Sequence, residues 1–401
     1  MYNILHISAD FPDAYSERKT PAVCNLIEGA PEFTHTVFSI NRLAGLQGTR
    51  IIKRADNVIT LVYKAPPFGV LLDTFLRRLA DHILEDIQGS NMRPDLIHAH
   101  KLTIEGLVAQ RLSQALGCPY VCTIRGNTDQ KYIRAKPGMR RRWRQVAQQA
   151  AWLFPVTPWV DRYVSKTLLP DTGQRSLLPT VTRINHNFPP RETSRRLVTA
   201  FHLAGWKMKG MPGLFTALRQ LRGTAHEIGL DILGGGSPEH TQALQREIEK
   251  HGLGDLVTLR GAIPHDQMAQ ELNGYSGFVL PTLRETFGMV YIEALFSGIP
   301  ILYSMDRGVD GFFDEQNVGV RCDPTSVASI AKGIEEMLDN VDPMKHEIAM
   351  LQQTGGFDRF RQHKVCRDYA DRAARIIENG SEQTRLDVSH TRPSHITGTK
   401  I

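Results

Sequence analysis

The stretch RETFGMVYIEALFSGIP, from Arg284 to Pro300, decides how the surrounding chain is expected to fold. The apolar run just before it, residues 276–281, is typical of a short buried strand that a proline closes. A helix is expected to begin at Gly288 and to end at Gly298, before a second extended run. The order of strand, loop, helix and strand predicts a parallel α/β sheet, which binds ligands at the carboxyl ends of its strands.

Two carboxylates lie at this expected sheet edge. Glu285 falls in the loop after the strand, and Glu293 falls about one turn inside the helix. The first N–H groups of a helix lack partners and favour anions, and carboxylates accept hydrogen bonds from hydroxyl groups. The stretch therefore predicts a site for a phosphorylated ligand that also carries hydroxyl groups. Alternatively, Glu285 complements the helix dipole and Glu293 is an ordinary helix-surface residue.

The composition indicates a globular protein of two domains. The chain has 401 residues, of which 41% are hydrophobic and 22% charged, and a net charge of +6. This charge favours an anionic partner such as a phosphate or a membrane surface without requiring nucleic acid. Five cysteines without CxxC spacing argue against a disulfide framework, and no long apolar run indicates a signal peptide or a membrane span. We therefore expect a cytoplasmic protein.

The rest of the chain alternates short apolar runs with amphipathic segments, which predicts βαβ units. Strands are expected at residues 2–8, 35–40, 58–63, 94–100, 119–124, 198–204, 230–236, 256–261, 276–281 and 300–303. Helices are expected from residue 22 and at residues 74–87, 105–116, 210–221, 241–252, 326–338 and 359–377, and residues 143–157 are expected to run from helix into strand. The proline- and charge-rich residues 187–196 interrupt the pattern and are interpreted as a linker.

The second half of the chain resembles the GT-B glycosyltransferases of family 4, also called group 1. Four segments carry the resemblance in order: AGWKMKGMPGLFTAL, LDILGGGSPEHTQAL, VTLRGAIPHDQM and LPTLRETFGMVYIEALFSGIPILYS. The last contains the family's pair of glutamates separated by seven residues, Glu285 and Glu293. The first half matches more loosely, through ILHIS, DLIHAHKLTIEGLVA and GCPYVCTIRGNTD.

The resemblance implies an α/β GT-B fold, in which two Rossmann-like, doubly wound parallel-sheet domains face a central cleft. The expected division is residues 1–190 as an acceptor-side domain and 191–358 as the domain for the nucleotide-sugar donor. Residues 359–379 are expected to form a helix that crosses back to the first domain. Residues 380–401, which are polar and without periodicity, are expected to be a disordered tail.

The resemblance also assigns roles to the residues around the opening stretch. Glu285 is expected to contact the donor sugar hydroxyls, and Glu293 the ribose hydroxyls. The turn of Phe287 and Gly288, with the N–H groups of Gly288, Met289 and Val290, is expected to hold the diphosphate.

Further candidates come from other segments. Lys209 matches the lysine that neutralises the diphosphate, and Lys207 is a candidate for the arginine that usually precedes it. The triple glycine around Gly235 is implied to be a close-packed loop near the nucleotide; as a NAD fingerprint it lacks the third glycine. His100 and Arg125 are expected at strand exits, either as ligands of a phosphate or an anionic acceptor, or as a core histidine and an ion-paired arginine.

The segment KYIRAKPGMRRRWR, residues 131–144, supports a separate hypothesis. It contains seven cations together with Tyr132 and Trp143. Basic segments with interfacial aromatic residues can bind anionic lipid, although most such runs are solvated surface. We therefore expect either peripheral contact with the inner face of the plasma membrane or an ordinary exposed surface.

These observations predict a retaining glycosyltransferase that moves a sugar from a UDP- or GDP-sugar to a glycan or lipid-linked glycan acceptor. The sequence has no Asp-x-Asp, so no metal and no cofactor are expected, and the family's common role suggests bacterial surface polysaccharide or glycolipid assembly. Three alternatives stay open. They are a glycosidase that uses the two carboxylates as acid and base, a nucleotide-sugar epimerase or phosphorylase, and a non-catalytic protein that binds nucleotide sugars.

Overall fold

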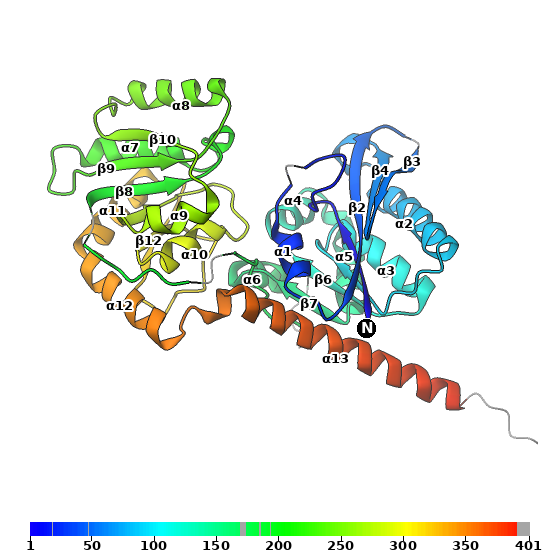
Figure 1. The fold of residues 1–401 in the computed structure, drawn as a ribbon. Coiled ribbons are helices and arrows are strands. Elements are labelled where there is room, and N and C mark those ends of the chain that lie inside the picture. Colours follow the sequence, from blue (N-terminus) through cyan, green and yellow to red (C-terminus); the bar gives the residue numbers. More distant parts are fainter. Residues whose placement is uncertain (18, 47, 169–173, 184–185, 193, 391–401) are drawn as a thin grey trace, which may run out of the picture. The chain divides into compact units, whose positions relative to one another are not determined.

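A computed structural model describes residues 1–401 except 18, 47, 169–173, 184–185, 193 and 391–401. The chain divides into two compact units, each with its own sheet (Figure 1). The first unit comprises Met1–Thr123, Arg141–Leu153 and Cys366–Ile401, and the second comprises Ile124–Arg140 and Phe154–Val365. The chain thus passes to the second unit twice, at residues 124 and 154, and returns to the first unit at residue 141 and again at residue 366 for its last helix.

The first unit is built on a seven-stranded sheet in the order β3-β4-β2-β1-β5-β6-β7. Its strands are β1 (Asn3–Ser8), β2 (Thr34–Ala44), β3 (Thr49–Ala55), β4 (Val58–Ala65), β5 (Leu96–Ala99), β6 (Tyr120–Ile124) and β7 (Trp152–Pro155). β1 pairs in parallel with β2 and β5, while β3 runs antiparallel to β4 at the edge. When the edge strand β3 is left aside, the remaining order β4-β2-β1-β5-β6-β7 is that of a doubly wound nucleotide-binding sheet.

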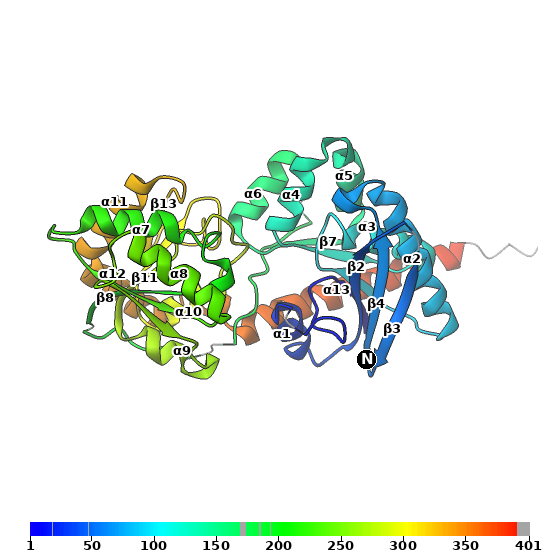
Figure 2. The same cartoon turned by 90° about the horizontal axis from the view of Figure 1, so that it is seen from above.

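Helices cover both faces of this sheet. They are α1 (Ala22–Glu28), α2 (Leu72–Gly89), α3 (Glu105–Leu116), α5 (Arg140–Gln149) and α13 (Gln362–His390). α2 and α3 pack against one another on one face, and α1 and α13 meet on the other, where Cys366 lies against Asn25 (Figure 2). Tyr369 of α13 contacts His98 of β5, with 3.0 Å between the phenol oxygen and Nδ1.

The end of the chain differs from its expected form. The polar tail predicted from Gly380 is helical as far as His390, as a continuation of α13, and residues 391–401 lie outside the described residues. A helix already nucleated by packing adds one hydrogen bond for each residue that it fixes, so it extends beyond its apolar pattern.

Trp143, predicted as an interfacial aromatic of the basic segment, is instead fully buried and donates a hydrogen bond to the Thr103 carbonyl at 3.0 Å. Its indole ring is therefore unavailable to a membrane. The reason is helical periodicity: Trp143, Val146 and Ala147 share the buried face of α5, while the neighbouring arginines point outwards.

The second unit is built on a six-stranded sheet in the order β10-β9-β8-β11-β12-β13. Its strands are β8 (Ser194–Ala200), β9 (Gly229–Leu233), β10 (Val257–Gly261), β11 (Tyr275–Val279), β12 (Ile301–Ser304) and β13 (Gly319–Cys322). Neighbouring strands pair in parallel throughout. Counted within the unit the order is 3-2-1-4-5-6, and its direction reverses between β8 and β11.

Helices again cover two faces of the sheet. They are α7 (Met211–Leu221), α8 (Pro238–Lys250), α9 (His265–Leu272), α10 (Met289–Phe296), α11 (Val327–Asp339) and α12 (Val341–Thr354). Two more helices that fall in the second unit, α4 (Asn127–Ala135) and α6 (Pro158–Thr167), directly follow β6 and β7 in the chain. α7 packs on α11 and α9 packs on α10, on opposite faces of the sheet (Figure 2). One hydrophobic core joins these helices to the buried strands. The predicted fold class, two doubly wound parallel α/β domains, is confirmed.

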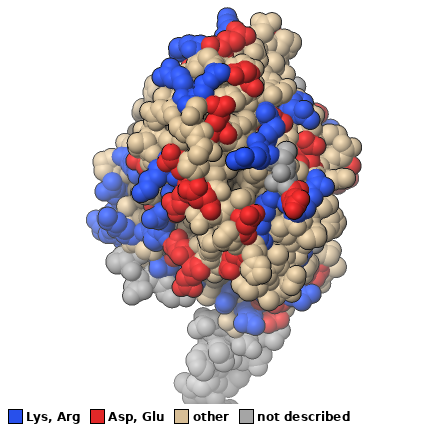
Figure 3. Space-filling model, turned by 90° about the vertical axis from the view of Figure 1, so that its left-hand side faces the viewer, with Lys and Arg blue, Asp and Glu red and all other residues tan. Residues whose placement is uncertain are grey.

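The surface carries charges of both signs. On the face shown in Figure 3, lysine and arginine side chains are interspersed with aspartate and glutamate, without one broad field of a single sign. Among the described residues, no helix is both long and apolar enough to cross a lipid bilayer.

Candidate active site

The reversal of strand order in the second unit brings two loops together at the carboxyl ends of β8 and β11. The backbone N–H of Leu283, which follows β11, donates to the Met208 carbonyl at 2.9 Å. The Thr282 hydroxyl donates to the same carbonyl at 3.1 Å. Open α/β sheets bind ligands at such a reversal, because the loops on either side diverge and leave a crevice.

Gly210 allows this close approach. It precedes α7 in a left-handed conformation, with φ of +80°, and a Cβ built on it would lie 1.8 Å from the Pro281 carbonyl oxygen. No side chain fits into that space. The glycine of the Lys-Gly pair is thus required by packing against the end of β11, and it positions the lysine that precedes it.

Lys209 and Glu285 form an ion pair across the two loops. The Lys209 Nζ lies 2.6 Å from the Glu285 Oε2, and the two side chains are 26% and 17% exposed. The other carboxylate oxygen of Glu285 accepts the Thr286 N–H at 3.0 Å. The pair is partly open to solvent, so an incoming anion could contact the ammonium group while a hydroxyl donates to the carboxylate.

The start of α10 lies directly after this pair. Gly288 caps the helix in a left-handed conformation, and no side chain supplies a capping hydrogen bond to its first turn. Tyr291 is buried beneath the turn, and its hydroxyl donates to the Leu280 carbonyl at 2.6 Å. Burial, and then the charge of Glu285, raises the pKa of Tyr291 well above its ordinary value. The phenol therefore stays neutral and anchors the turn to the end of β11.

The other residues of the opening stretch occupy distinct places. Phe287 is buried, and its ring packs edge-on against the Phe312 ring with 6.0 Å between the centroids. Met289 and Val290 begin α10 and are half-buried, while Glu293 lies further along the helix and is only 8% exposed. Phe287 thus holds the turn on the core. The expected roles of Met289, Val290 and Glu293 in binding stay predictions.

Two other predicted segments lie at the same end of the sheet. Gly235 belongs to a tight loop after β9, where its carbonyl accepts the Leu203 N–H at 2.9 Å and a Cβ on the preceding Gly234 would lie 1.8 Å from the Phe201 oxygen. Lys207 is exposed, and its ammonium lies 5.2 Å from the centre of the Trp206 ring. Nothing in this geometry assigns either residue a ligand.

His100 belongs to the first unit, where it follows β5 and is fully buried in a chain of histidines. Its Nε2 lies 3.0 Å from the His6 Nδ1, and the His6 Nε2 lies 2.9 Å from the His35 Nδ1. Burial, followed by the nearby His98 and His35, lowers the pKa of His6 well below its ordinary value. Ligand atoms of His6, His98 and His100 lie within 4.8 Å of one another, a spacing that could hold a metal ion. His6 and His100 are also within hydrogen-bonding distance, as expected for neutral core histidines.

Arg125 follows β6, and its backbone N–H donates to the buried carboxylate of Asp129 at 3.2 Å. The Asp129 side chain therefore caps the turn that leads into α4. The guanidinium of Arg125 is half-buried, and a role for it in binding an anion stays a prediction.

Sequence reasoning did not identify a charged group at the strand reversal of the first unit. Lys101, which follows β5, pairs with Asp10 at 2.7 Å and lies 3.7 Å from the buried Glu105. Burial raises the pKa of Glu105 to about 7, and the charge of Lys101 opposes this shift. Lys101 directly follows His100 at the end of a buried strand, and a cation at that place in the sequence is the signal that could have identified this group.

Trp159 was also not identified from the sequence. Its indole N–H lies 3.1 Å from the Gly308 carbonyl oxygen and 3.3 Å from the Thr286 carbonyl oxygen.

Known proteins share this architecture. The family models described as "Glycosyl transferase 4-like domain" and "Glycosyl transferases group 1" match residues 21–180 and 186–350. The putative teichuronic acid biosynthesis glycosyltransferase TuaC of Bacillus subtilis is 24% identical over 71% of this chain and 71% of its own.

Two solved structures have the same fold. The sucrose-phosphate synthase of Thermosynechococcus elongatus superposes with a TM-score of 0.68 at 17% identity, over 97% of this chain and 100% of that one. Anabaena Alr3699/HepE in complex with UDP has a TM-score of 0.62 at 15% identity, over 92% and 99%. One family model matches each half, and the fold agrees along nearly the whole chain; the protein therefore belongs to the group 1 glycosyltransferases with the GT-B fold.

Proposed function

We propose that this protein is a retaining glycosyltransferase that moves a sugar from a nucleoside-diphosphate sugar to a hydroxyl group without a metal or cofactor. The observation that carries the proposal is the 2.6 Å pair of Lys209 and Glu285 at the strand reversal, next to the start of α10, which receives no capping hydrogen bond from a side chain. A cation, backbone N–H groups and a carboxylate lie together where the fold presents its ligands. They match the diphosphate and the hydroxyl groups of a nucleotide sugar.

Lys209 acts on the leaving group. Cleavage of the bond between sugar and phosphate leaves negative charge on the diphosphate, and a fixed ammonium stabilises this charge most in the transition state. The first N–H groups of α10, at Met289 and Val290, add a second source of positive potential. These groups supply the charge stabilisation that a metal ion supplies in other transferases, which supports a reaction without metal.

Glu285 and Glu293 act on the rest of the donor. Glu285 accepts hydrogen bonds from sugar hydroxyls when the diphosphate draws the Lys209 ammonium towards itself. Glu293 binds the ribose hydroxyls, in keeping with the family resemblance. The donor is a UDP- or GDP-sugar; the UDP-bound Anabaena structure of the same fold supports the first.

Retention requires that the new bond form on the face from which the old one breaks. The acceptor hydroxyl approaches the anomeric carbon beside the departing diphosphate, through a state of oxocarbenium character. The acceptor proton passes to the leaving diphosphate oxygen, so that charge and protons balance. This mechanism rests on the resemblance to retaining family members.

The acceptor is a glycan or lipid-linked glycan of bacterial surface polysaccharide or glycolipid assembly, at the cytoplasmic side of the envelope. Similarity to a putative teichuronic acid glycosyltransferase supports this class. The odd number of cysteines supports a reducing compartment.

The exposed Lys131, Arg134 and Arg140 offer charges for peripheral contact with anionic lipid. Co-sedimentation with phosphatidylserine vesicles that is unchanged when these residues become glutamine would overturn the lipid contact.

A panel of UDP-, GDP- and ADP-sugars in a thermal-shift assay tests the donor assignment. A donor at a hundred times its dissociation constant stabilises the folded chain by about 2.7 kcal/mol, so the correct nucleotide raises the melting temperature and the others do not. Lys209→Ala should lose most of this shift. Its matched control is Lys250→Ala, which removes a 71% exposed lysine of the same unit. With the donor known, the NMR coupling constant of the new anomeric proton shows whether configuration is retained. No shift with any nucleotide sugar, or an inverted product, would contradict the proposal.

A further inference from the structure

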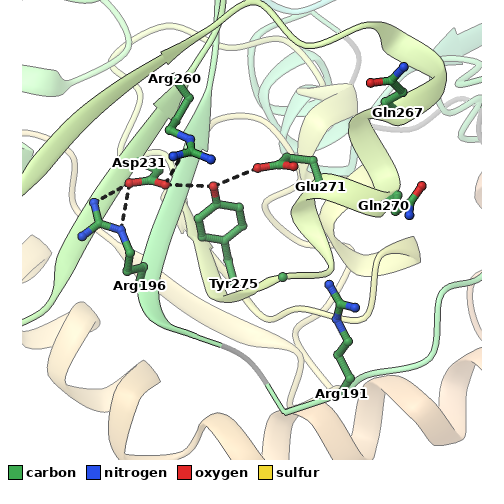
Figure 4. Close-up of a pocket in the computed structure, with 9 residues that line it drawn as sticks. Arg191, Arg196, Asp231, Arg260, Gln267, Gln270, Glu271 and Tyr275 are labelled. Carbon is green, nitrogen blue, oxygen red and sulfur yellow. Dashed lines mark hydrogen bonds and ion pairs between the residues drawn. The ribbon is translucent and has the colours of Figure 1, made fainter.

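The second unit has a cavity at the amino ends of its strands, opposite the carboxyl ends at which the candidate active site lies. It has a volume of about 610 Å³ and is lined by residues of β8, β9, β10, β11 and α9 (Figure 4). Arg196 pairs with the first residue of β9, and Tyr275 is the first residue of β11, so the cavity lies at the amino ends of these strands. Lys209 and Glu285 follow the carboxyl ends. The two sites therefore lie at opposite ends of the strands.

Three arginines line this cavity, and two of them, Arg196 and Arg260, approach one buried carboxylate. Asp231, whose side chain is 6% exposed, accepts hydrogen bonds from Arg196 and from the Tyr275 hydroxyl, the latter at 2.9 Å. Arg260 approaches the same carboxylate more loosely, at 3.6 Å. The Glu271 Oε1 lies 3.1 Å from the same Tyr275 hydroxyl, whose single proton is shared between the two carboxylates. The carboxylate of Asp231 is thus shared by two guanidinium groups and a phenol.

Arg196 has a structural role. Besides Asp231, it donates to the carbonyls of Leu230 and Leu256 at 3.3 Å each, and to the Thr258 hydroxyl at 3.2 Å. These contacts tie β8 to β9 and β10. Its Nε and one terminal nitrogen are taken up by these contacts, so the position of the side chain needs no ligand to explain it.

Arg191 and Arg260 are different. Arg191 uses its Nε to donate to the Asn273 carbonyl at 3.1 Å, and Figure 4 shows its guanidinium turned towards the cavity wall formed by α9 and β11. Arg260 is half-exposed, and its Nε makes the one loose contact with Asp231. Within the described residues, the terminal nitrogens of these two arginines have no hydrogen-bond acceptor. Two planar forks with open donors at one cavity suit a carboxylate or a phosphate.

The remaining wall is suited to hydroxyl groups. Gln267 and Gln270 on α9 line the cavity with their side-chain amides, which lack hydrogen-bond partners among the described residues (Figure 4). An amide both donates and accepts, as a sugar hydroxyl does. The volume falls in the range that holds a small ligand rather than a single ion.

We propose that this cavity is a second binding site, separate from the active site, for a small anionic sugar that carries a phosphate or carboxylate group. The terminal nitrogens of Arg191 and Arg260 hold the anionic group, and Gln267 and Gln270 bind the hydroxyls of the ring. Asp231 keeps Arg260 in place, the Asn273 carbonyl holds Arg191, and Asp231 and Glu271 position Tyr275. The site is independent of the donor, so it stands or falls separately from the proposed transferase activity.

Isothermal titration calorimetry of the full chain tests the site with four probes: glucose 6-phosphate, glucuronate, glucose and inorganic phosphate. The two anionic sugars should bind, with affinities that fall as salt is added, and glucose should not. Arg260→Gln should weaken binding of the anionic sugars about 10-fold or more, because it removes charge-assisted hydrogen bonds. Arg191→Gln should act in the same way and serves if the first variant folds poorly.

Two controls make the test specific. Arg246→Gln removes an exposed arginine of α8 in the same unit, away from the cavity, and should leave binding unchanged. Lys209→Ala should also leave it unchanged, which separates this site from the active site. The proposal is overturned if no anionic sugar binds, if glucose or inorganic phosphate binds as tightly as glucose 6-phosphate, or if Arg260→Gln and Arg191→Gln bind like the wild type.

Discussion

Replacement of Gly288 by alanine should destabilise the second unit and displace Glu285. The residue has φ of +74°, and a Cβ built on it would lie 2.6 Å from the Tyr291 Cδ2 and 3.1 Å from the Glu285 Cγ. The Tyr291 ring cannot turn away without losing the bond from its hydroxyl to the Leu280 carbonyl. Crowding of this kind costs about 1–3 kcal/mol, in addition to about 1–2 kcal/mol for an alanine in the left-handed region.

Gly252→Ala separates these two costs. Gly252 follows α8 in the same unit with φ of +69°, and a Cβ there would have nothing within 4 Å. It carries the left-handed strain without the crowding. Gly288→Ala should therefore lose about 1–3 kcal/mol more than Gly252→Ala, measured as the difference in urea unfolding midpoint multiplied by the slope. It should also bind the donor more weakly. An equal loss of unfolding free energy in the two variants would refute the claim that the Gly288 turn has no room for a side chain.

Three further predictions concern other parts of the two units. Gly210→Ala would place a Cβ 1.8 Å from the Pro281 oxygen, so its unfolding free energy should fall by about 3 kcal/mol or more; Gly223→Ala, with φ of +77° and open space, should lose clearly less, and equal losses would contradict this. Burial raises the pKa of Glu105 from 4.5 to about 7, so the wild type should lose about 3 kcal/mol relative to Glu105→Gln as pH rises from 4.5 to 7; a difference independent of pH in urea unfolding would refute it. Burial lowers the pKa of His6, so as pH falls below 6.5 the unfolded chain takes up a proton at this residue that the folded chain excludes, and the folded protein loses stability. His6→Asn should therefore lose less melting temperature than the wild type as pH falls. The same pH dependence of the melting temperature in both proteins would contradict this prediction.

Much of the fold could be predicted because most strands are buried on both faces. The apolar runs that form β1, β4, β9 and β11 stand out against the polar loops around them. β3 was not predicted. Its sequence TRIIKRA is exposed at most positions, as an edge strand of a hairpin is, and so it reads as a polar segment. β13 was missed because its sequence GVRC contains an exposed arginine and only two buried residues, so it forms no apolar run.

The candidate site was predictable only where a local pattern carried it. The two glutamates and the glycine between them form one continuous segment, so the loop and the helix start were recognised. The ion pair between Lys209 and Glu285 joins residues 76 positions apart, and only the family resemblance brought them to one site. Residues 187–196 were interpreted as a linker, although Arg191 and Arg196 line the second cavity. That cavity combines separate segments of the chain, and no local spacing predicts it.

The most direct test of the central claim is the rate at which the protein releases nucleoside diphosphate from its nucleotide-sugar donor. Lys209→Ala should lower kcat roughly 100-fold or more, because it removes a charge that stabilises the leaving diphosphate in the transition state. Lys250→Ala should turn over like the wild type, since it removes an exposed lysine of the same unit at a distance from the site. Turnover of Lys209→Ala at the wild-type rate would contradict the account.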